Sequence, residues 1–127
     1  MVNYAVVVDL SRFRRGIDLF NRGEFFDAHE VLEDVWRAAP DEEKKFLQGL
    51  IQVAVGLHHY STGNKVGARS LLARADRNLS SYPEGLQGVK LAPLRARLAE
   101  WILALDNDHK APPLPRIEIA NDSKPEL

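Results

Sequence analysis

The sequence predicts an all-α fold, a compact bundle of about five helices made of two helical hairpins and a C-terminal helix. Three observations support this fold class. Apolar residues recur at intervals of three and four in five segments, as they do along one face of a helix. Glycine, proline or asparagine stands where most of these segments end. With 127 residues, of which 45% are hydrophobic, the chain can bury a core, and we place a single domain at residues 1–110.

The first two segments predict a helical hairpin. Ser11 is placed as the N-cap of a helix that continues to about residue 22, and Gly23 ends it. A second helix is expected over residues 25–39, because Pro40 cannot continue it. The apolar faces of the two helices would carry Phe13, Ile17, Phe20, Phe25, Ala28, Leu32, Val35 and Trp36.

The next two segments predict a second hairpin. Pro40 and Asp41 open a third helix, which is apolar on nearly all sides from residue 46 to residue 60. Such a helix needs neighbours on several sides, so we expect it at the centre of the bundle. Gly63 and Asn64 end it and cap a fourth helix over residues 65–79.

A fifth helix and a tail complete the chain. Pro93 suits the first turn of a helix that ends near residue 105. Residues 111–127 are rich in proline and charge, which predicts an extended, partly mobile C-terminal tail. Docking of this tail against the bundle is expected at Leu114, Ile117 and Ile119.

The two hairpins share one pattern with a period of 40 residues, set by Gly23 and Gly63. The aligned pairs are Phe13 with Val53, Gly16 with Gly56, Ile17 with Leu57, Phe20 with Tyr60, Ala28 with Ala68, Leu32 with Leu72 and Val35 with Ala75. The residues around Gly23 resemble the turn and second helix of a tetratricopeptide repeat. That repeat has about 34 residues, and solenoids need roughly three copies of it. We therefore expect a compact bundle with a tetratricopeptide-like internal repeat.

Composition argues against several classes of function. The 17 basic and 18 acidic residues give a net charge of -1, which favours neither nucleic acid nor an anionic membrane as a partner. The absence of cysteine excludes disulfides, thiolate metal ligands and a cysteine nucleophile. No segment reaches the roughly 18 apolar residues of a membrane span, and the N-terminal segment lacks the basic leader of a secretory signal. We therefore expect a cytoplasmic protein.

The second helix carries a candidate motif, formed by His29, Glu33, Trp36 and Arg37. Residues three and four apart share a helix face, so these side chains lie together beside the apolar stripe. An imidazole beside a carboxylate provides an oriented base or half of a metal site, with Arg37 keeping Glu33 ionised. The structural alternative is an interface histidine and tryptophan next to a solvated ion pair, and spacing alone favours it.

Three polar side chains interrupt the apolar third helix, at Gln48, Gln52 and His59. Their intervals of four and seven place them along roughly one side of the helix. A buried amide without a partner costs on the order of a few kcal/mol, so these groups need polar neighbours. We expect them to face His29 and Glu33 in one polar pocket between the second and third helices. The spacing to Gln52 favours His59 over its neighbour His58.

Two histidines and a glutamate form a common ligand set for zinc or iron, and helical bundles build such sites from facing side chains. We therefore assign His29, Glu33 and His59 as candidate ligands of a divalent metal. Two known helical signatures are absent, the glutamate-x-x-histidine pairs of di-iron bundles and the His-Glu-x-x-His of metalloproteases. A structural hydrogen-bond network is the alternative interpretation.

Residues 20–37, together with 46–52 and 59–64, resemble the DUF309 family, domain of unknown function family 309, a group of small helical proteins of bacteria and archaea. The most specific part is the His-x-x-x-Glu-x-x-Trp-Arg core of residues 29–37. The resemblance extends over about residues 13–79 and implies an all-helical fold without implying an activity. The positions that match the family's motif are His29, Glu33, Trp36, Arg37, Gln48, Gln52 and His59.

Three functions fit these observations. The first, which we favour, is a binding module whose polar pocket between the second and third helices holds a small ligand or a metal ion. The second is a hydrolase or transferase in which Glu33 orients His29 as a base. The third is a homodimeric scaffold for protein interactions, built on the repeat and the tail.

Overall fold

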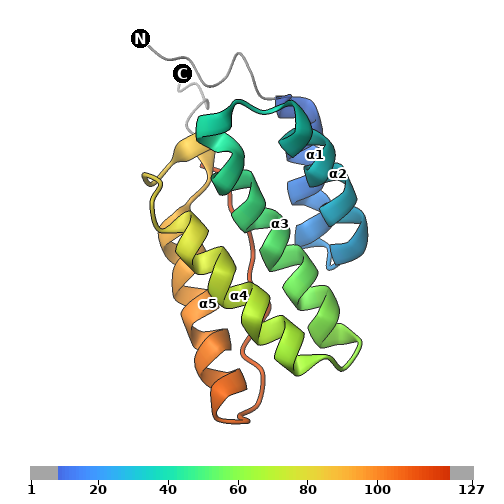
Figure 1. The fold of residues 1–127 in the computed structure, drawn as a ribbon, viewed down its shortest axis with the longest axis vertical. Coiled ribbons are helices and arrows are strands. Elements are labelled where there is room, and N and C mark those ends of the chain that lie inside the picture. The colour runs from blue at the N-terminus through green and yellow to red at the C-terminus, as the bar shows by residue number, and fades with distance from the viewer. Residues whose placement is uncertain (1–8, 121–127) are drawn as a thin grey trace, which may run out of the picture.

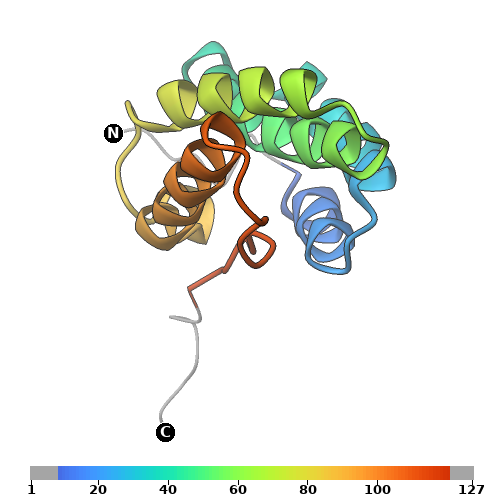
Figure 2. The same ribbon diagram turned by 90° about the horizontal axis from the view of Figure 1, so that it is seen from below.

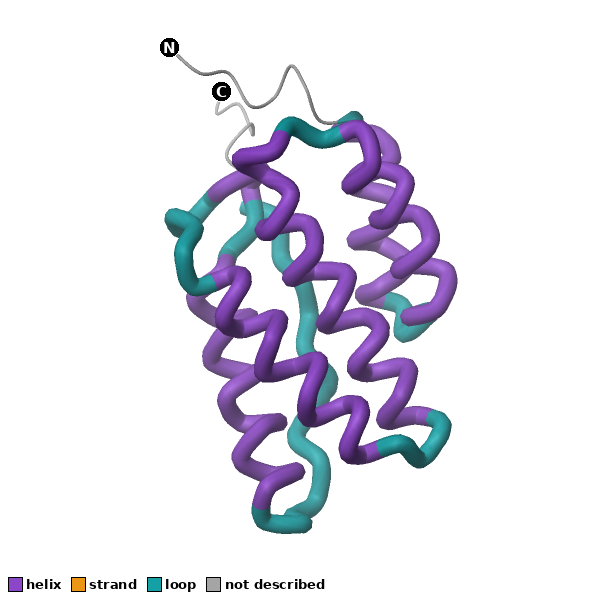
Figure 3. The backbone as a smooth tube through the Cα atoms, viewed as in Figure 1, coloured by secondary structure: helices purple, strands orange, loops and turns teal. Residues whose placement is uncertain are grey.

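The computed structural model describes residues 9–120, and within them it is an all-α bundle (Figures 1 and 3). Its helices are α1 (Leu10–Asn21), α2 (Phe25–Ala38), α3 (Asp41–Ser61), α4 (Lys65–Leu79) and α5 (Leu91–Asp106), with a short 3-10 turn, η2 (Leu86–Gly88). The predicted fold class of about five helices is therefore confirmed. Over the described part of the chain, no helix combines the length and hydrophobicity needed to cross a membrane.

Each helix packs mainly on the next one along the chain, α1 on α2, α2 on α3, α3 on α4 and α4 on α5. Figure 2 shows that this succession curves into an arch. The chain after α5 returns along the inner side of the arch, between α5 and α1 (Figures 1 and 2). The arch therefore has a lining that comes from the end of the same chain.

The predicted cap of the first helix differs from the structure. Ser11 is not an N-cap, because Asp9 holds that position and its Oδ1 accepts a hydrogen bond from the Arg12 backbone N–H at 3.1 Å. The carboxylate competes well for this position because it also complements the positive end of the helix. The fifth helix begins at Leu91, before Pro93, which nevertheless lies within the first turn as expected.

The two hairpins have the same turn and the same close contact. Gly23 and Gly63 both adopt positive φ, 83° and 91°, which glycine tolerates at a helix end. A methyl group on Gly16 would lie 2.7 Å from Leu32 Cδ2, and one on Gly56 would lie 3.1 Å from Leu72 Cδ2. The aligned glycine and leucine positions thus meet within each hairpin. The likeness to tetratricopeptide repeats stays a prediction.

Residues 111–120 dock against the bundle in extended form. Ile117 is only 1% exposed, and Ile119 forms an antiparallel bridge with Val89. The expectation for Leu114 is wrong, since its side chain points outward and is 52% exposed. The mobile end expected for the tail falls, at residues 121–127, outside the described residues, and the domain boundary at residue 110 stays a prediction.

A carboxylate is buried beneath the loop that joins α4 to α5. Glu43, in the first turn of α3, is 0% exposed, and its Oε1 accepts a hydrogen bond of 3.1 Å from Gln87 Nε2. Its Oε2 has no partner among the described residues. Burial raises the pKa of Glu43, because the charged form loses its hydration. Gln87 holds a left-handed backbone conformation, with φ of 54°, in reaching it.

Replacement of Gly16 by alanine should lower the free energy of unfolding by up to about 2 kcal/mol. Overpacking against buried Leu32 costs roughly 1 to 3 kcal/mol, and the helix propensity of alanine returns about 1 kcal/mol. Gly56→Ala is the matched control, because its neighbour is less crowded, and it should be closer to neutral. Urea denaturation of both variants measures the difference, and equal effects would contradict this account of the hairpin contact.

Glu43→Gln should increase stability at neutral pH. Because the pKa of Glu43 is raised in the folded state, its carboxylate binds a proton more tightly in the folded protein than in the unfolded chain. The wild type therefore loses stability as the pH rises from about 4.5, the ordinary pKa of this group, through its pKa in the folded protein. Glutamine does not titrate, so the advantage of the variant should grow between pH 4 and pH 8. Denaturation across this range provides the measurement; an advantage that shrinks with rising pH would show that Glu43 is stabilised as an anion.

Candidate functional site

A groove of about 200 Å³ lies where the first turns of α2 meet the last turns of α3. It is lined by Phe25, Phe26, His29, Val55, His58 and His59. The sharp connection at Pro40 makes α3 return along α2, so the start of one helix lies beside the end of the other. The groove therefore joins an apolar surface to three imidazole rings.

The rings in the groove are arranged around Phe26. The centroid of its ring lies 5.5 Å from those of both His29 and His58, and the His58 and His59 centroids are 6.5 Å apart. Phe26 is 51% exposed, although its neighbour Phe25 is buried against Phe20. A large apolar ring is thus presented to solvent between two histidines.

The motif on α2 forms a chain of polar contacts beside the groove. His29 Nε2 lies 3.5 Å from Glu33 Oε2, and Glu33 Oε1 lies 3.5 Å from Arg37 Nη2. Arg37 makes its shorter contact, 2.7 Å, with Asp34. The other ring nitrogen of His29, Nδ1, is buried and has no hydrogen-bond partner among residues 9–120. The side chain of His29 is 22% exposed, so its ring is accessible from the groove on one side.

Trp36 packs at the other end of the same face. Lys44 Nζ lies 4.3 Å from the centroid of the Trp36 ring and donates a hydrogen bond of 2.7 Å to the Trp36 carbonyl oxygen. This cation lies at the C-terminus of α2, where it offsets the negative end of the helix. Trp36 therefore belongs to the junction of α2 and α3, and its indole does not line the groove.

The glutamines do not join the histidines, so the single polar pocket expected between the helices is wrong. Gln48 is exposed, and Gln52 Oε1 accepts a hydrogen bond of 2.9 Å from Asn78 Nδ2 on α4. At about 100° per residue, Gln48, Gln52 and His59 form an outward stripe of α3 that lies between its contacts with α2 and α4. His59 is at the groove, but its Nδ1 lies 3.5 Å from the Asn64 amide nitrogen.

Sequence reasoning missed His58 and Phe26 as parts of the site. His58 follows from the same helical geometry, because it is turned by about 100° from His59, toward α2. That direction is known only once the position of α2 is known. Phe26 gives a weaker signal, an aromatic residue next to the buried Phe25 and outside the apolar stripe.

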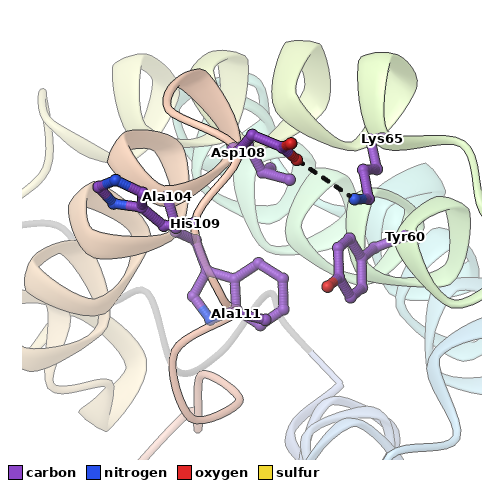
Figure 4. Close-up of a pocket in the computed structure, with 8 residues that line it drawn as sticks. Tyr60, Lys65, Ala104, Asp108, His109 and Ala111 are labelled. Atoms are coloured by element: carbon purple, nitrogen blue, oxygen red, sulfur yellow. Dashed lines mark ion pairs between the residues drawn. The ribbon is translucent and has the colours of Figure 1, made fainter.

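The other hollow at the end of α3 is too small for a ligand. Figure 4 shows it between Tyr60 and Lys65 on one side and Ala104, Asp108, His109 and Ala111 on the other. Its volume is about 10 Å³, enough for a single water molecule at most. The ion pair that closes it joins Lys65 Nζ and Asp108 Oδ1 at 3.7 Å, and both side chains are exposed.

The metal interpretation receives no support from the geometry. Over the described part of the chain, no three histidine, cysteine, aspartate or glutamate side chains are placed to hold one ion. His29 and Glu33 are neighbours, but they do not form a set of three with His59. A divalent metal held by His29, Glu33 and His59 stays a prediction.

Comparison with known proteins finds a family match and two relatives. Residues 13–71 match the family model described as a domain of unknown function, DUF309. An uncharacterised protein of Aquifex aeolicus (strain VF5) is 37% identical over 82 residues, 64% of this chain and 25% of its own length. The uncharacterised protein YpuF of Bacillus subtilis (strain 168) is 33% identical over 69 residues, 54% of this chain and 40% of YpuF. The chain is similar to DUF309 over residues 13–71 and matches less than half the length of each of these relatives.

The polar chain on α2 should contribute little to stability. Glu33 is 41% exposed in its side chain and its contacts are long, so Glu33→Gln should change the free energy of unfolding by less than about 1 kcal/mol. Asp34→Asn, one residue further along and also exposed, is the matched control. Thermal and chemical denaturation give the comparison; a loss of several kcal/mol for Glu33→Gln alone would mean that His29 depends on this carboxylate for its place in the fold.

Proposed function

We propose that this DUF309-domain protein is a binding module, and that the groove between α2 and α3 takes a small ligand with an aromatic or aliphatic body and an anionic head. The observation that carries the proposal is the half-exposed Phe26 between the rings of His29 and His58. All six residues of the groove fall within the DUF309 match.

The apolar half of the ligand is argued from Phe25, Phe26 and Val55. A ligand that covers the exposed ring of Phe26 gains about 25 cal/mol for each Å² of apolar surface removed from water. Aromatic groups also pair favourably at centroid distances of roughly 4.5 to 7 Å. The groove already contains ring pairs in this range, so an added ring finds the same kind of partner.

The polar half is argued from the imidazoles. Every imidazole offers at least one N–H donor, and a protonated one offers two, so three rings around one groove favour an acceptor or an anion. None of the six lining residues is acidic. The nearest carboxylate on α2, Glu33, already lies beside His29 and Arg37. A carboxylate, sulfonate or phosphate head therefore meets donors without an opposing anion in the groove.

The enzymatic alternative has less support. Its base would be His29, oriented by Glu33 at 3.5 Å, but the lining residues include no hydroxyl, thiol or amine that could act as a nucleophile. The homodimeric scaffold and the cytoplasmic location remain predictions. A binding role needs only the surface and the donors described above.

Anilinonaphthalene sulfonate, an aromatic anion whose fluorescence rises on binding, is a suitable probe. We expect saturable binding to the wild type and about tenfold weaker binding to Phe26→Ala, the effect of roughly 1.4 kcal/mol. Val66→Ala is the matched control, because Val66 is an exposed apolar residue outside the groove, at 83% exposure. Equal affinities of the wild type and Phe26→Ala would refute binding at this groove.

The anionic head is tested separately with phenylnaphthylamine, a probe of similar shape that lacks the sulfonate. The double variant His29→Gln and His58→Gln should reduce the affinity for the sulfonate probe more than the affinity for the neutral probe. Circular dichroism verifies that the variant is folded. An identical loss for both probes would leave an apolar groove without recognition of charge and would remove the anionic head from the proposal.

A further inference from the structure

The inner side of the arch contains an extended stretch of the chain, residues 111–120, between α1 and α5 (Figure 2). This surface shares no lining residue with the groove between α2 and α3. Alternate residues of the stretch face the bundle, with Pro115 and Ile117 buried and Leu114, Arg116 and Glu118 exposed. The stretch lies on the helices as an extended peptide would.

Asn21, at the end of α1, holds the main chain of this stretch. Its Nδ2 donates a hydrogen bond of 2.9 Å to the Ile117 carbonyl oxygen, and its Oδ1 accepts one of 2.9 Å from the Ile117 N–H. One side-chain amide thus satisfies both backbone groups of a single residue. Contacts of this kind recognise an extended backbone whatever the side chains are.

Helix α5 and the loop before it supply a second set of backbone contacts. Trp101 Nε1 donates a hydrogen bond of 2.9 Å to the Pro113 carbonyl oxygen, and Arg97 Nη1 approaches the same oxygen at 3.3 Å. The Lys90 N–H donates to the Glu118 carbonyl oxygen at 2.9 Å. Protein groups on both walls therefore bind the main chain, and the buried side chain of Ile117 fixes the register.

Ile117 packs into the hydrophobic core, and hollows open to solvent lie on both sides of the stretch. A hollow of about 440 Å³ remains beside it, bordered by Arg14, Ile17, Asp18 and Asn21 of α1. Another of about 260 Å³ lies on the α5 side, bordered by Pro93 and Arg97. Both hollows are open to solvent, so the outer edges of the stretch are accessible from either side.

The two walls also differ in their relation to the family. All of α1 from residue 13 onward, Asn21 included, lies inside the DUF309 match at residues 13–71, whereas α5 and residues 111–120 lie outside it. The wall that holds the peptide backbone belongs to the shared domain, and the segment that covers it does not. The wall residues that border the hollows carry three cations and one anion, Arg14, Lys90, Arg97 and Asp18.

We propose that the space between α1 and α5 is a peptide-binding groove, and that residues 111–120 occupy it as an exchangeable ligand of the same chain. The partner it fits is an extended segment of another protein, with proline and a β-branched residue at alternate positions and an acidic residue after them, as in Pro115, Ile117 and Glu118. Release requires no helix to unfold, because the connection after α5, residues 107–110, is exposed.

A protease site inserted after Asp108, in this exposed connection, tests exchange in a protein that has already folded. After cleavage, a labelled peptide of residues 111–120 should replace the bound segment and raise fluorescence polarisation. The uncut protein should bind the peptide at least about 100-fold more weakly, because a tethered competitor acts at a high effective concentration. Exchange only under conditions that unfold the helices would overturn the proposal.

Asn21→Ala in the cleaved protein should weaken binding of the peptide at least about tenfold. Gln48→Ala, which removes an exposed amide elsewhere, should leave the binding of the peptide unchanged. A peptide with Ile117→Asp should not bind. If Asn21→Ala impairs folding, hydrogen exchange of the uncut wild type provides a second test. The backbone amide of Ile117 should then exchange faster than it could through global unfolding alone. Exchange of the Ile117 amide at the rate of global unfolding would contradict a segment of another protein as the partner. The formation of dimers by swapped tails, in place of peptide binding, would contradict it as well.

Discussion

The arrangement of the whole molecule depends on the close approach of two helices within each hairpin. Gly16 lets α1 lie against Leu32 of α2, and Gly56 lets α3 lie against Leu72 of α4. Where the backbones come this close, the larger apolar side chains fill the groove between helices, and the pairing angle of each hairpin is fixed. The hairpins then join through α2 and α3, and the arch in Figure 2 results.

Both candidate surfaces follow from this arrangement. The junction of α2 and α3 brings the histidines at its end next to Phe26, and the curvature of the arch leaves α1 and α5 apart with a space between them. The first surface is apolar with imidazole donors, whereas the second binds main chain through Asn21 and Trp101. One suits a small amphipathic anion and the other an extended polypeptide.

Local signals predicted the helices well, and the site less well. Gly23, Gly63 and Pro40 mark breaks that depend only on backbone chemistry, so those helix ends could be located from the sequence. The sequence could not show which face of α3 packs against which helix, because a helix that is apolar on nearly all sides does not reveal which side lacks a neighbour. Gln52 therefore pairs with Asn78 on α4, away from His29, and His58 belongs to the groove together with His59. The burial of Glu43 could not be predicted either, because it depends on a loop more than 40 residues away.

The order in which helices touch one another has a consequence for synthesis on the ribosome. Because each helix packs chiefly on its predecessor, the bundle can assemble progressively as the chain emerges, with little need for distant contacts. The exception is the inner face of α1, whose Asn21 meets a residue 96 positions later. Until that late residue is translated, a nascent copy leaves the Asn21 amide bonded to water and Ile17 without this cover, so the inner face of α1 is completed last.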